Sequence, residues 1–185
     1  MRRLGQELEV EAMSLYNHVA NKEDILDGIL DAVVTEFDLP SDTGDWRVAM
    51  RSAAISANEV MLRHPWAPGL LLSRLHDGPA RLRHTNALLG CLRSAGFSLK
   101  KTHHAYHVLD GHIIGYTLQQ VSFPIADEDL NDAGTTFLEE LPVDEFPHLV
   151  EQVRGHIEGH YEGESGFVFG LDLILEGLER LRESE

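Results

Sequence analysis

Apolar residues recur along the chain at the three- and four-residue spacing of amphipathic helices. No segment alternates convincingly between apolar and polar residues with the period of two that a half-buried strand needs. The main helical repeats cover residues 22–38, 45–63, 78–95, 99–121, 147–161 and 166–181. The pattern therefore predicts an all-α fold.

Two shorter repeats precede these and lie close together. Leu4 and Leu8 form one i, i+4 apolar pair, and Leu15 and Val19 form another after a break. Two such segments joined by a tight turn are typical of a helix-turn-helix. The second segment also carries small polar side chains beside its apolar pair, which suits a DNA major groove. The same spacing fits an ordinary surface hairpin, so DNA binding is one of two interpretations.

Residues 22–38 are predicted to connect a small head to a larger body. Asn21 is a favourable N-cap, and Asp24 three residues later completes a variant of the capping box. Apolar residues then form a stripe over about four turns, and Pro40 with Gly44 ends the segment. We expect a head with its connector in residues 1–38 and a second domain in residues 39–185.

Glycines mark two of the later helices. Gly111 and Gly115 lie in the predicted helix 99–121, and Gly170 and Gly177 lie in 166–181. A mid-helix glycine costs about 1 kcal/mol relative to alanine, which suggests that another helix approaches closely. Residues 121–147 instead carry eight acids, no base and three prolines. We expect a mobile, variable loop there, with room for one short helix.

Composition narrows the class of protein. The chain has 185 residues, 43% of them hydrophobic, and a formal net charge of −16. This charge argues against nucleic-acid binding, but residues 1–22 are neutral and the whole excess lies in 23–185. No run approaches the roughly 20 apolar residues that span a bilayer, and no apolar segment follows the first residues, so we expect no secretory leader. The single cysteine, Cys91, excludes an intramolecular disulfide, so the cytoplasm is the expected location.

The eleven histidines are the main candidates for site chemistry. His103 with His107, and His156 with His160, have the i, i+4 spacing of two nitrogen ligands on one helix face. Solvated histidines are the simpler interpretation, so neither a metal nor a cofactor is expected. The sequence contains no Ser/His/Asp set, Gly-rich phosphate loop or cysteine cluster, so an enzyme is not expected.

Two motifs resemble one protein family. Leu15-Tyr16-Asn17-His18-Val19, followed by Asn21-Lys22, resembles the L-Y-x-H-V-x-N-K signature of the TetR (tetracycline repressor-like) transcriptional regulators. Residues 167–179 are similar to the closing helix of the tetracycline-repressor C-terminal domain, F-x-F-G-L-x-L-I-x-x-G-L-E. Residues 96–115 also match, so the resemblance covers nearly the whole chain.

The resemblance implies a homodimeric repressor that a small molecule releases from a palindromic operator, with half-sites about one DNA turn apart. Three residues of the head would hold phosphates, namely Tyr16, His18 and Lys22. The rest of the DNA-binding set would face base edges or lie beside them, and consists of Arg2, Ala12, Met13, Ser14 and Asn17.

An effector pocket is implied between the helices 45–63, 78–95 and 99–121. Its candidate lining residues are Trp66, Leu70, Leu71, His76, Asn86, Leu89, His104, His107 and His112. Most of them could equally be plain core. Tetracycline repressors offer a His-Leu-Gly-Thr-Arg-Pro segment to the drug and its magnesium, where residues 72–77 here read Leu-Ser-Arg-Leu-His-Asp. Tetracycline with magnesium is therefore not the expected ligand.

The implied dimer surface is a four-helix bundle made by 99–121 and 166–181 with their copies in the partner. Its candidate residues are Gly111, Gly115, Leu118, Phe167, Gly170, Leu171, Ile174, Gly177 and Leu178.

The family's DNA-binding head has a further helix before the segment that begins at Arg2, and the sequence begins without it. Two short helices with one-sided stripes cannot bury those stripes alone, so we expect an incomplete head. Two hypotheses follow. The first is a ligand-responsive repressor, and the second is a truncated regulator that acts only as a dimer binding a small molecule or a partner.

Overall fold

The computed structural model describes residues 1–185 except 42–43, 75–77, 123–126, 161–162, 164 and 185. Every regular element in this described part is a helix, which confirms the predicted all-α class. The helices are α1 (Arg2–Glu7), α2 (Ala12–Leu15), α3 (Lys22–Val34), α4 (Trp46–Arg63), α5 (Ala67–Ser73), α6 (Pro79–Ser94), α7 (Leu99–Ser122), α8 (Asp127–Glu140), α9 (Pro147–Ile157) and α10 (Gly166–Glu183).

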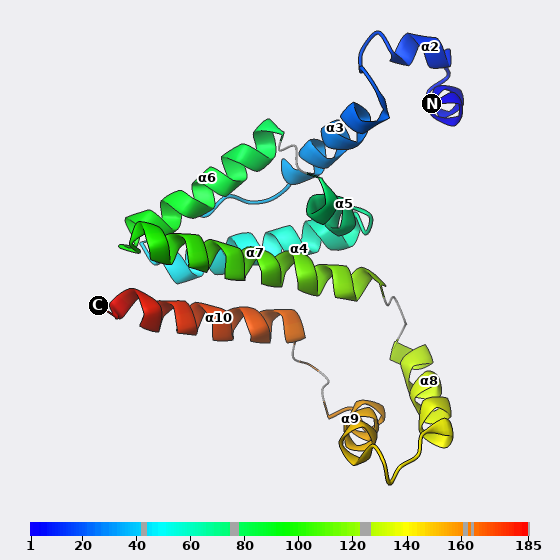
Figure 1. The fold of residues 1–185 in the computed structure, drawn as a ribbon, viewed down its shortest axis with the longest axis vertical. Coiled ribbons are helices and arrows are strands. Elements are labelled where there is room, and N and C mark those ends of the chain that lie inside the picture. Colours follow the sequence, from blue (N-terminus) through cyan, green and yellow to red (C-terminus); the bar gives the residue numbers. More distant parts are fainter. Residues whose placement is uncertain (42–43, 75–77, 123–126, 161–162, 164, 185) are drawn as a thin grey trace.

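Helices α4, α7 and α10 run side by side through the centre of the body (Figure 1). The long α7 packs against α10, α4, α5 and α6, so it is the element around which the body is assembled. The α4 helix suits this setting because its buried face is rich in alanine, including Ala53, Ala54 and Ala57. Such short side chains allow the axes of neighbouring helices to approach.

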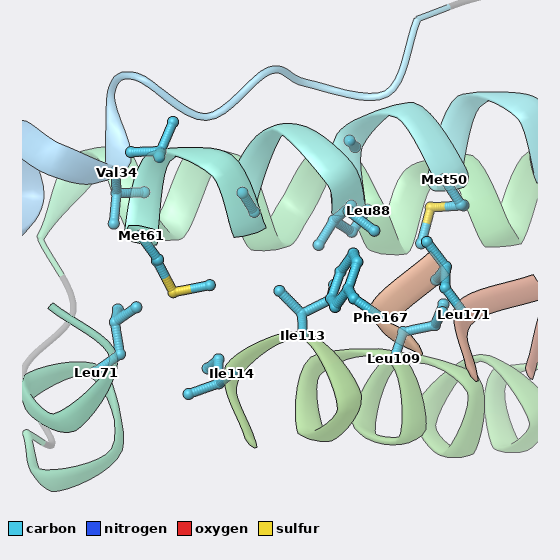
Figure 2. Close-up of a cluster of buried hydrophobic side chains, with 14 of the residues drawn as sticks. Val34, Met50, Met61, Leu71, Leu88, Leu109, Ile113, Ile114, Phe167 and Leu171 are labelled. Atoms are coloured by element: carbon cyan, nitrogen blue, oxygen red, sulfur yellow. The ribbon is translucent and has the colours of Figure 1, made fainter. Parts of the chain in front are cut away.

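The core is one cluster to which α3–α7 and α10 contribute. Figure 2 shows side chains from these helices converging, among them Met61 of α4, Ile113 of α7 and Phe167 of α10. Phe97, in the turn between α6 and α7, is also fully buried. Burying a side chain of this size stabilises the fold by about 1.5–3 kcal/mol, so the core ties the helices of the body together.

The connector α3 links the body to the head, which consists of α1 and α2 (Figure 1). Only its C-terminal half is buried in the body, through Leu30, Val33 and Val34. Helices α1 and α2 pack chiefly against each other. The α2 helix ends at Leu15, earlier than the apolar pair predicted, and the backbone continues to His18 in turns with i to i−3 hydrogen bonds.

Helices α8 and α9 lie at the opposite end of the molecule from the head (Figure 1) and pack chiefly against each other. The sequence led us to expect a loop with one short helix in 121–147, but α8 has 14 residues. The acids did not prevent this, because an amphipathic helix needs only one apolar face to pack, and α9 supplies the opposite one with buried Val150.

Candidate functional site

The head presents most of its predicted DNA-binding residues to solvent. Met13 is 73% exposed and Tyr16 is 46% exposed. Ser14 is half-buried, and its hydroxyl donates to the Glu11 carbonyl oxygen at 2.7 Å, one turn back along the chain. The other exposed members are Asn17, His18 and Lys22. The predicted side chains of Arg2 and Ala12 lie outside the described part of the structure.

The start of α3 is capped as the sequence predicted. The Asn21 side chain accepts from the backbone N–H of Asp24 at 3.0 Å. In return, the Asp24 carboxylate accepts from the backbone N–H of Ala20 at 2.9 Å. This reciprocal pair holds Lys22 at the first turn of α3, where unpaired N–H groups favour an anion such as a phosphate.

Arg74, which follows α5, ties the connector to the body. Its guanidinium donates to Asp27 and to the carboxylate of Glu23, the latter at 2.6 Å, and also to the Glu23 carbonyl oxygen at 3.0 Å. The Arg74 side chain is only 12% exposed. Its two carboxylate partners hold the pKa of Arg74 above its usual range, Asp27 contributing most. The ion pairs of Arg74 with Asp27 and Glu23 therefore join α3 to the end of α5.

Asp31 makes the second link from the connector. Its carboxylate oxygen accepts from the backbone N–H groups of Ala80 at 2.8 Å and Arg81 at 3.2 Å. Asp31 thus caps the α6 N-terminus from another helix, since Gly78, at the N-cap position, makes no side-chain cap. A Cβ on Gly78 would collide with the Asp31 side chain, so the contact requires glycine there.

The end of the connector region is held to α4. The Glu36 carboxylate pairs with Arg63 at 3.1 Å and with His64 at 2.9 Å. These hydrogen bonds, Arg63 first, lower the pKa of Glu36. Farther along, the backbone N–H of Asp38 donates to Ser56 of α4 at 3.0 Å. Residues 23–38 thus carry four polar attachments to the body.

A small internal cavity of about 10 Å³ lies within the body, which is room for about one water molecule. Helices α4, α6 and α7 enclose it through Met50, Ala53, Ala54, His84, Leu88, Tyr106, Leu109, Asp110 and Ile113. His84 is notable because its Nε2 is buried without a hydrogen-bond partner in the described structure. Burial lowers the pKa of His84. Its ring lies 5.3 Å from that of Phe37, beyond the C-terminal end of α3.

The residues predicted to line an effector pocket are spread over the body. Leu71 is in the core, Leu70 packs against it, and Leu89 is half-buried. Trp66 is 41% exposed beside His64. Asn86, His104 and His107 are exposed, His112 is half-buried, and His76 lies outside the described residues. None of the eight described residues borders the internal cavity, so that set remains a prediction.

Sequence reasoning missed His84, although a signal for it was present. His84 lies four residues after Ala80 and four before Leu88, two buried positions of α6. A histidine on an apolar stripe points toward the interior, where it needs either a partner or a ligand. The predicted pocket set instead contains three histidines of α7, of which His104 and His107 are exposed and His112 is half-buried.

Several residues predicted for the dimer surface work inside the protomer. Phe167, Leu171 and Leu178 are buried in its core. Gly170 faces His112, whose ring carbon would lie 2.6 Å from a Cβ at that position. The same His112 hydrogen-bonds the Phe167 carbonyl oxygen at 2.9 Å and stacks on the Phe167 ring. These residues therefore pack between α7 and α10 of the same chain.

The outer side of the same two helices remains open. On α7, Gly111 and Gly115 are exposed with open space beside them, and Leu118 is half-buried. On α10, Phe169 is 52% exposed and Leu173 is 54% exposed. Ile174 and Gly177 of α10, which also belong to the predicted dimer surface, are half-buried. Two aligned helices thus present an apolar surface with small residues.

Metal-ligand clusters and membrane-spanning helices are both absent from the described part of the chain. Among the described residues, no group of three or more His, Cys, Asp or Glu side chains could hold a metal ion. His103 and His107 do lie together on α7, with ring centroids 4.4 Å apart. No helix in the described ranges has the length and apolar character to cross a membrane.

Similarity to known proteins covers the whole body. Residues 39–182 match the family of tetracyclin repressor-like C-terminal domains. The chain is 31% identical over 194 residues to the HTH-type transcriptional repressor DrrR1 of Streptomyces coeruleorubidus, covering 98% of this chain and 70% of that protein. An HTH-type transcriptional regulator of Saccharopolyspora erythraea is 36% identical over 116 residues, or 62% of this chain. That match spans only 49% of the relative, about half its length.

A solved structure gives the same result for the fold. The TetR family protein ActR of Streptomyces coelicolor, in complex with actinorhodin, superposes with a TM-score of 0.77 at 26% identity. The alignment covers 100% of this chain and 88% of ActR. The motifs at both ends, the helical order and these likenesses agree, and the chain belongs to the TetR family of transcriptional regulators, which are not enzymes.

Proposed function

We propose that the chain is a homodimeric, ligand-responsive repressor in which a small molecule bound in the body moves the connector α3 and so releases operator DNA. The observation that carries the proposal is the set of polar attachments between residues 23–38 and helices α4, α5 and α6. Because of these contacts, the orientation of α3 depends on the positions of α5 and α6. A shift of either helix would therefore reorient α3 and move the head attached to it.

The effector site proposed here is the internal cavity around His84. An unpaired buried nitrogen is costly, and a ligand that hydrogen-bonds to it would recover that cost. The cavity holds about one water, so an effector must push α6 away from α4 or α7. Such a displacement would act on Phe37 and on the α6 N-terminus that Asp31 caps, and both contacts belong to the connector region.

The dimer is proposed to form through the outer faces of α7 and α10. Exposed Phe169 and Leu173 supply apolar area, and exposed Gly111 and Gly115 permit close approach of the partner's helices. A two-fold axis there would present two copies of the head to a palindromic operator, one for each half-site. Met13, Tyr16, Asn17 and Lys22 are exposed in each copy.

DNA selection followed by titration tests the proposal. The protein is incubated with a random duplex library, and the enriched sequence is used in fluorescence-anisotropy titrations with and without actinorhodin, the ligand seen in ActR. We expect a palindromic sequence, and weaker binding when the ligand is present. His84→Leu should bind the same DNA but respond less to the ligand. Equal release of both proteins would overturn the assignment of the cavity.

A second candidate function is a regulator that binds a small molecule or a protein but not DNA. The observation in its favour is the exposed apolar surface of the head, where Leu8 is 56%, Val10 is 44% and Met13 is 73% exposed. Such side chains need a covering partner. If no sequence is enriched from the library while the ligand still raises the melting temperature, this second function is the correct one.

A further inference from the structure

A cleft of about 710 Å³ lies between the start of α4 and the ends of α6 and α10. These helix ends lie at the end of the body away from the head (Figure 1). It lies within the range of volumes that small-molecule sites have. Its lining includes Trp46 and Ala49 of α4, Ala87 and Cys91 of α6, and Glu179 and Arg182 of α10. It shares no lining residue with the cavity around His84.

One wall of the cleft is an aromatic ring held in place. The Trp46 indole N–H donates to Glu179 at 2.9 Å, and the ring meets Phe97 edge to face with centroids 5.0 Å apart. Phe97 is itself fully buried. A ligand ring would therefore meet a surface that is already ordered, so little side-chain entropy would be lost on binding.

The adjoining walls are made of small side chains from two helices. Ala49 of α4, together with Ala87 and Cys91 of α6, takes little space where a larger residue would fill the cleft. Burial raises the pKa of the Cys91 thiol, so the sulfur is an uncharged, weakly polar part of the lining. Short side chains beside a fixed indole suit a flat ring system.

The polar residues of the cleft balance one another in charge. Glu179 binds Arg182 through two hydrogen bonds of 2.6 and 3.0 Å, and Asp45 lies 3.5 Å from Arg47. Arg182 and the Trp46 indole, in that order, lower the pKa of Glu179 by hydrogen bonding. Two acids and two bases leave no net charge to attract an ion. These four polar side chains instead offer hydrogen-bond donors and acceptors to an uncharged group of a ligand.

We propose that this cleft is a second small-molecule site, for a flat, uncharged aromatic compound with polar groups along one edge. The ring would lie against Trp46 between α4 and α6, and its polar edge would meet the Glu179–Arg182 pair. A ligand there would contact the segment that follows the connector, through Pro40 and Ser41. The site is independent of the cavity proposed for the effector, and its failure would leave that proposal intact.

Energy transfer from Trp46 tests the site. The chain has two tryptophans, so Trp66→Phe leaves Trp46 as the only donor. The probe is 7-amino-4-methylcoumarin, which is flat and uncharged, carries polar groups and absorbs where tryptophan emits. We expect saturable quenching of Trp46 with one probe per protomer. Absence of saturable quenching would overturn the proposal.

Matched variants in the same background locate the probe. Ala87→Phe fills the cleft and should weaken binding by about tenfold or more, equivalent to at least about 1.4 kcal/mol. Ala32→Phe, at an exposed alanine of α3, should leave binding unchanged, as should His84→Leu in the other cavity. Quenching that survives Ala87→Phe, or that is lost with His84→Leu, would contradict the site. If Ala87→Phe does not fold by circular dichroism, Ser94→Phe blocks the cleft from its exposed rim.

Discussion

At the scale of single residues, the burial of His84 changes how readily its imidazole takes up a proton. The imidazole is desolvated between α6, α4 and α7, and its Nε2 has no partner in the described structure. The neutral form is therefore favoured in the fold, which lowers the pKa of His84 below its value of about 6.5 in an unfolded chain. A group of this kind gives the protein a pH-dependent stability.

The pH dependence has a definite sign. The stability that neutral His84 confers is complete above the unfolded pKa, about 6.5, and is lost as the pH falls from there through the lowered folded pKa. We expect His84→Leu to reduce the loss of melting temperature between neutral and mildly acidic pH, measured by circular dichroism. His104→Leu, at an exposed position, is the matched control. Identical pH profiles for His84→Leu and the wild type would refute this account.

Gly78 is a second residue with a measurable role. Gly78→Ala would place a Cβ against Asp31, so the carboxylate must leave the N–H groups of Ala80 and Arg81. We expect a loss of about 1–3 kcal/mol in unfolding free energy, measured by urea denaturation. Gly90→Ala, inside α6 rather than at its N-cap, is the control, because Gly90 faces open space and alanine favours the helix by up to about 1 kcal/mol. Equal effects at the two positions would show that the Asp31 contact contributes nothing.

At the scale of elements, the connector is held to the body by charge as much as by its apolar stripe. Arg74 makes a shared link, because one nearly buried guanidinium serves Asp27 and Glu23 together. Asp31 and Glu36 add links to α6 and α4. The three contacts lie on successive parts of residues 23–38, so they fix both the position and the direction of α3.

Removal of the Arg74 guanidinium should loosen the connector. Arg74→Met keeps much of the side-chain volume but leaves Asp27 and Glu23 without this partner, and hydrogen bonds to charged groups contribute about 1.5–3 kcal/mol. We expect a loss of that order in unfolding free energy and faster proteolysis within α3. Arg47→Met removes an exposed pair with Asp45, which at 3.5 Å and 47% exposure should contribute at most about 1 kcal/mol. A similar loss in both variants would contradict the special role of Arg74.

The helices of the body could be predicted from the sequence because their apolar residues recur with one period over many turns. The repeats predicted α3, α4, α6, α7 and α10 closely, and the Asn21 cap was correct. The length of α8 could not be predicted, since its packing depends on contacts with α9 that the acid-rich local sequence does not reveal.

The candidate sites were less predictable, because they depend on which side of a helix faces a partner. The spacing of Phe167, Leu171 and Leu178 identifies one apolar stripe but does not say whether it meets α7 of the same chain or of another. The structure assigns these three to the protomer core and leaves Phe169 and Leu173 outside. The link between Arg74 and Asp27 joins residues 47 positions apart, which no local pattern reveals.

At the scale of the whole molecule, dimer formation is expected to depend on the outer face of α7 and α10. Phe169→Glu places a charge in the centre of that face, where burial without a partner is costly. We expect this variant to be monomeric in analytical ultracentrifugation while the wild type is a dimer. Leu82→Glu, with a similar exposure of 57% on α6, should stay dimeric. If Phe169→Glu sediments as a dimer, the interface lies elsewhere.

The isolation of α8 and α9 has a consequence for the motions of the molecule. Because the two helices pack chiefly against each other, they can open without disturbing the core around Phe97 and Phe167. Local openings of this kind cost less free energy than global unfolding. In native-state hydrogen–deuterium exchange, we expect the amides of α8 and α9 to exchange together and well before those of the α7 centre. The regulator would then contain two cooperative folding units of unequal stability within one chain.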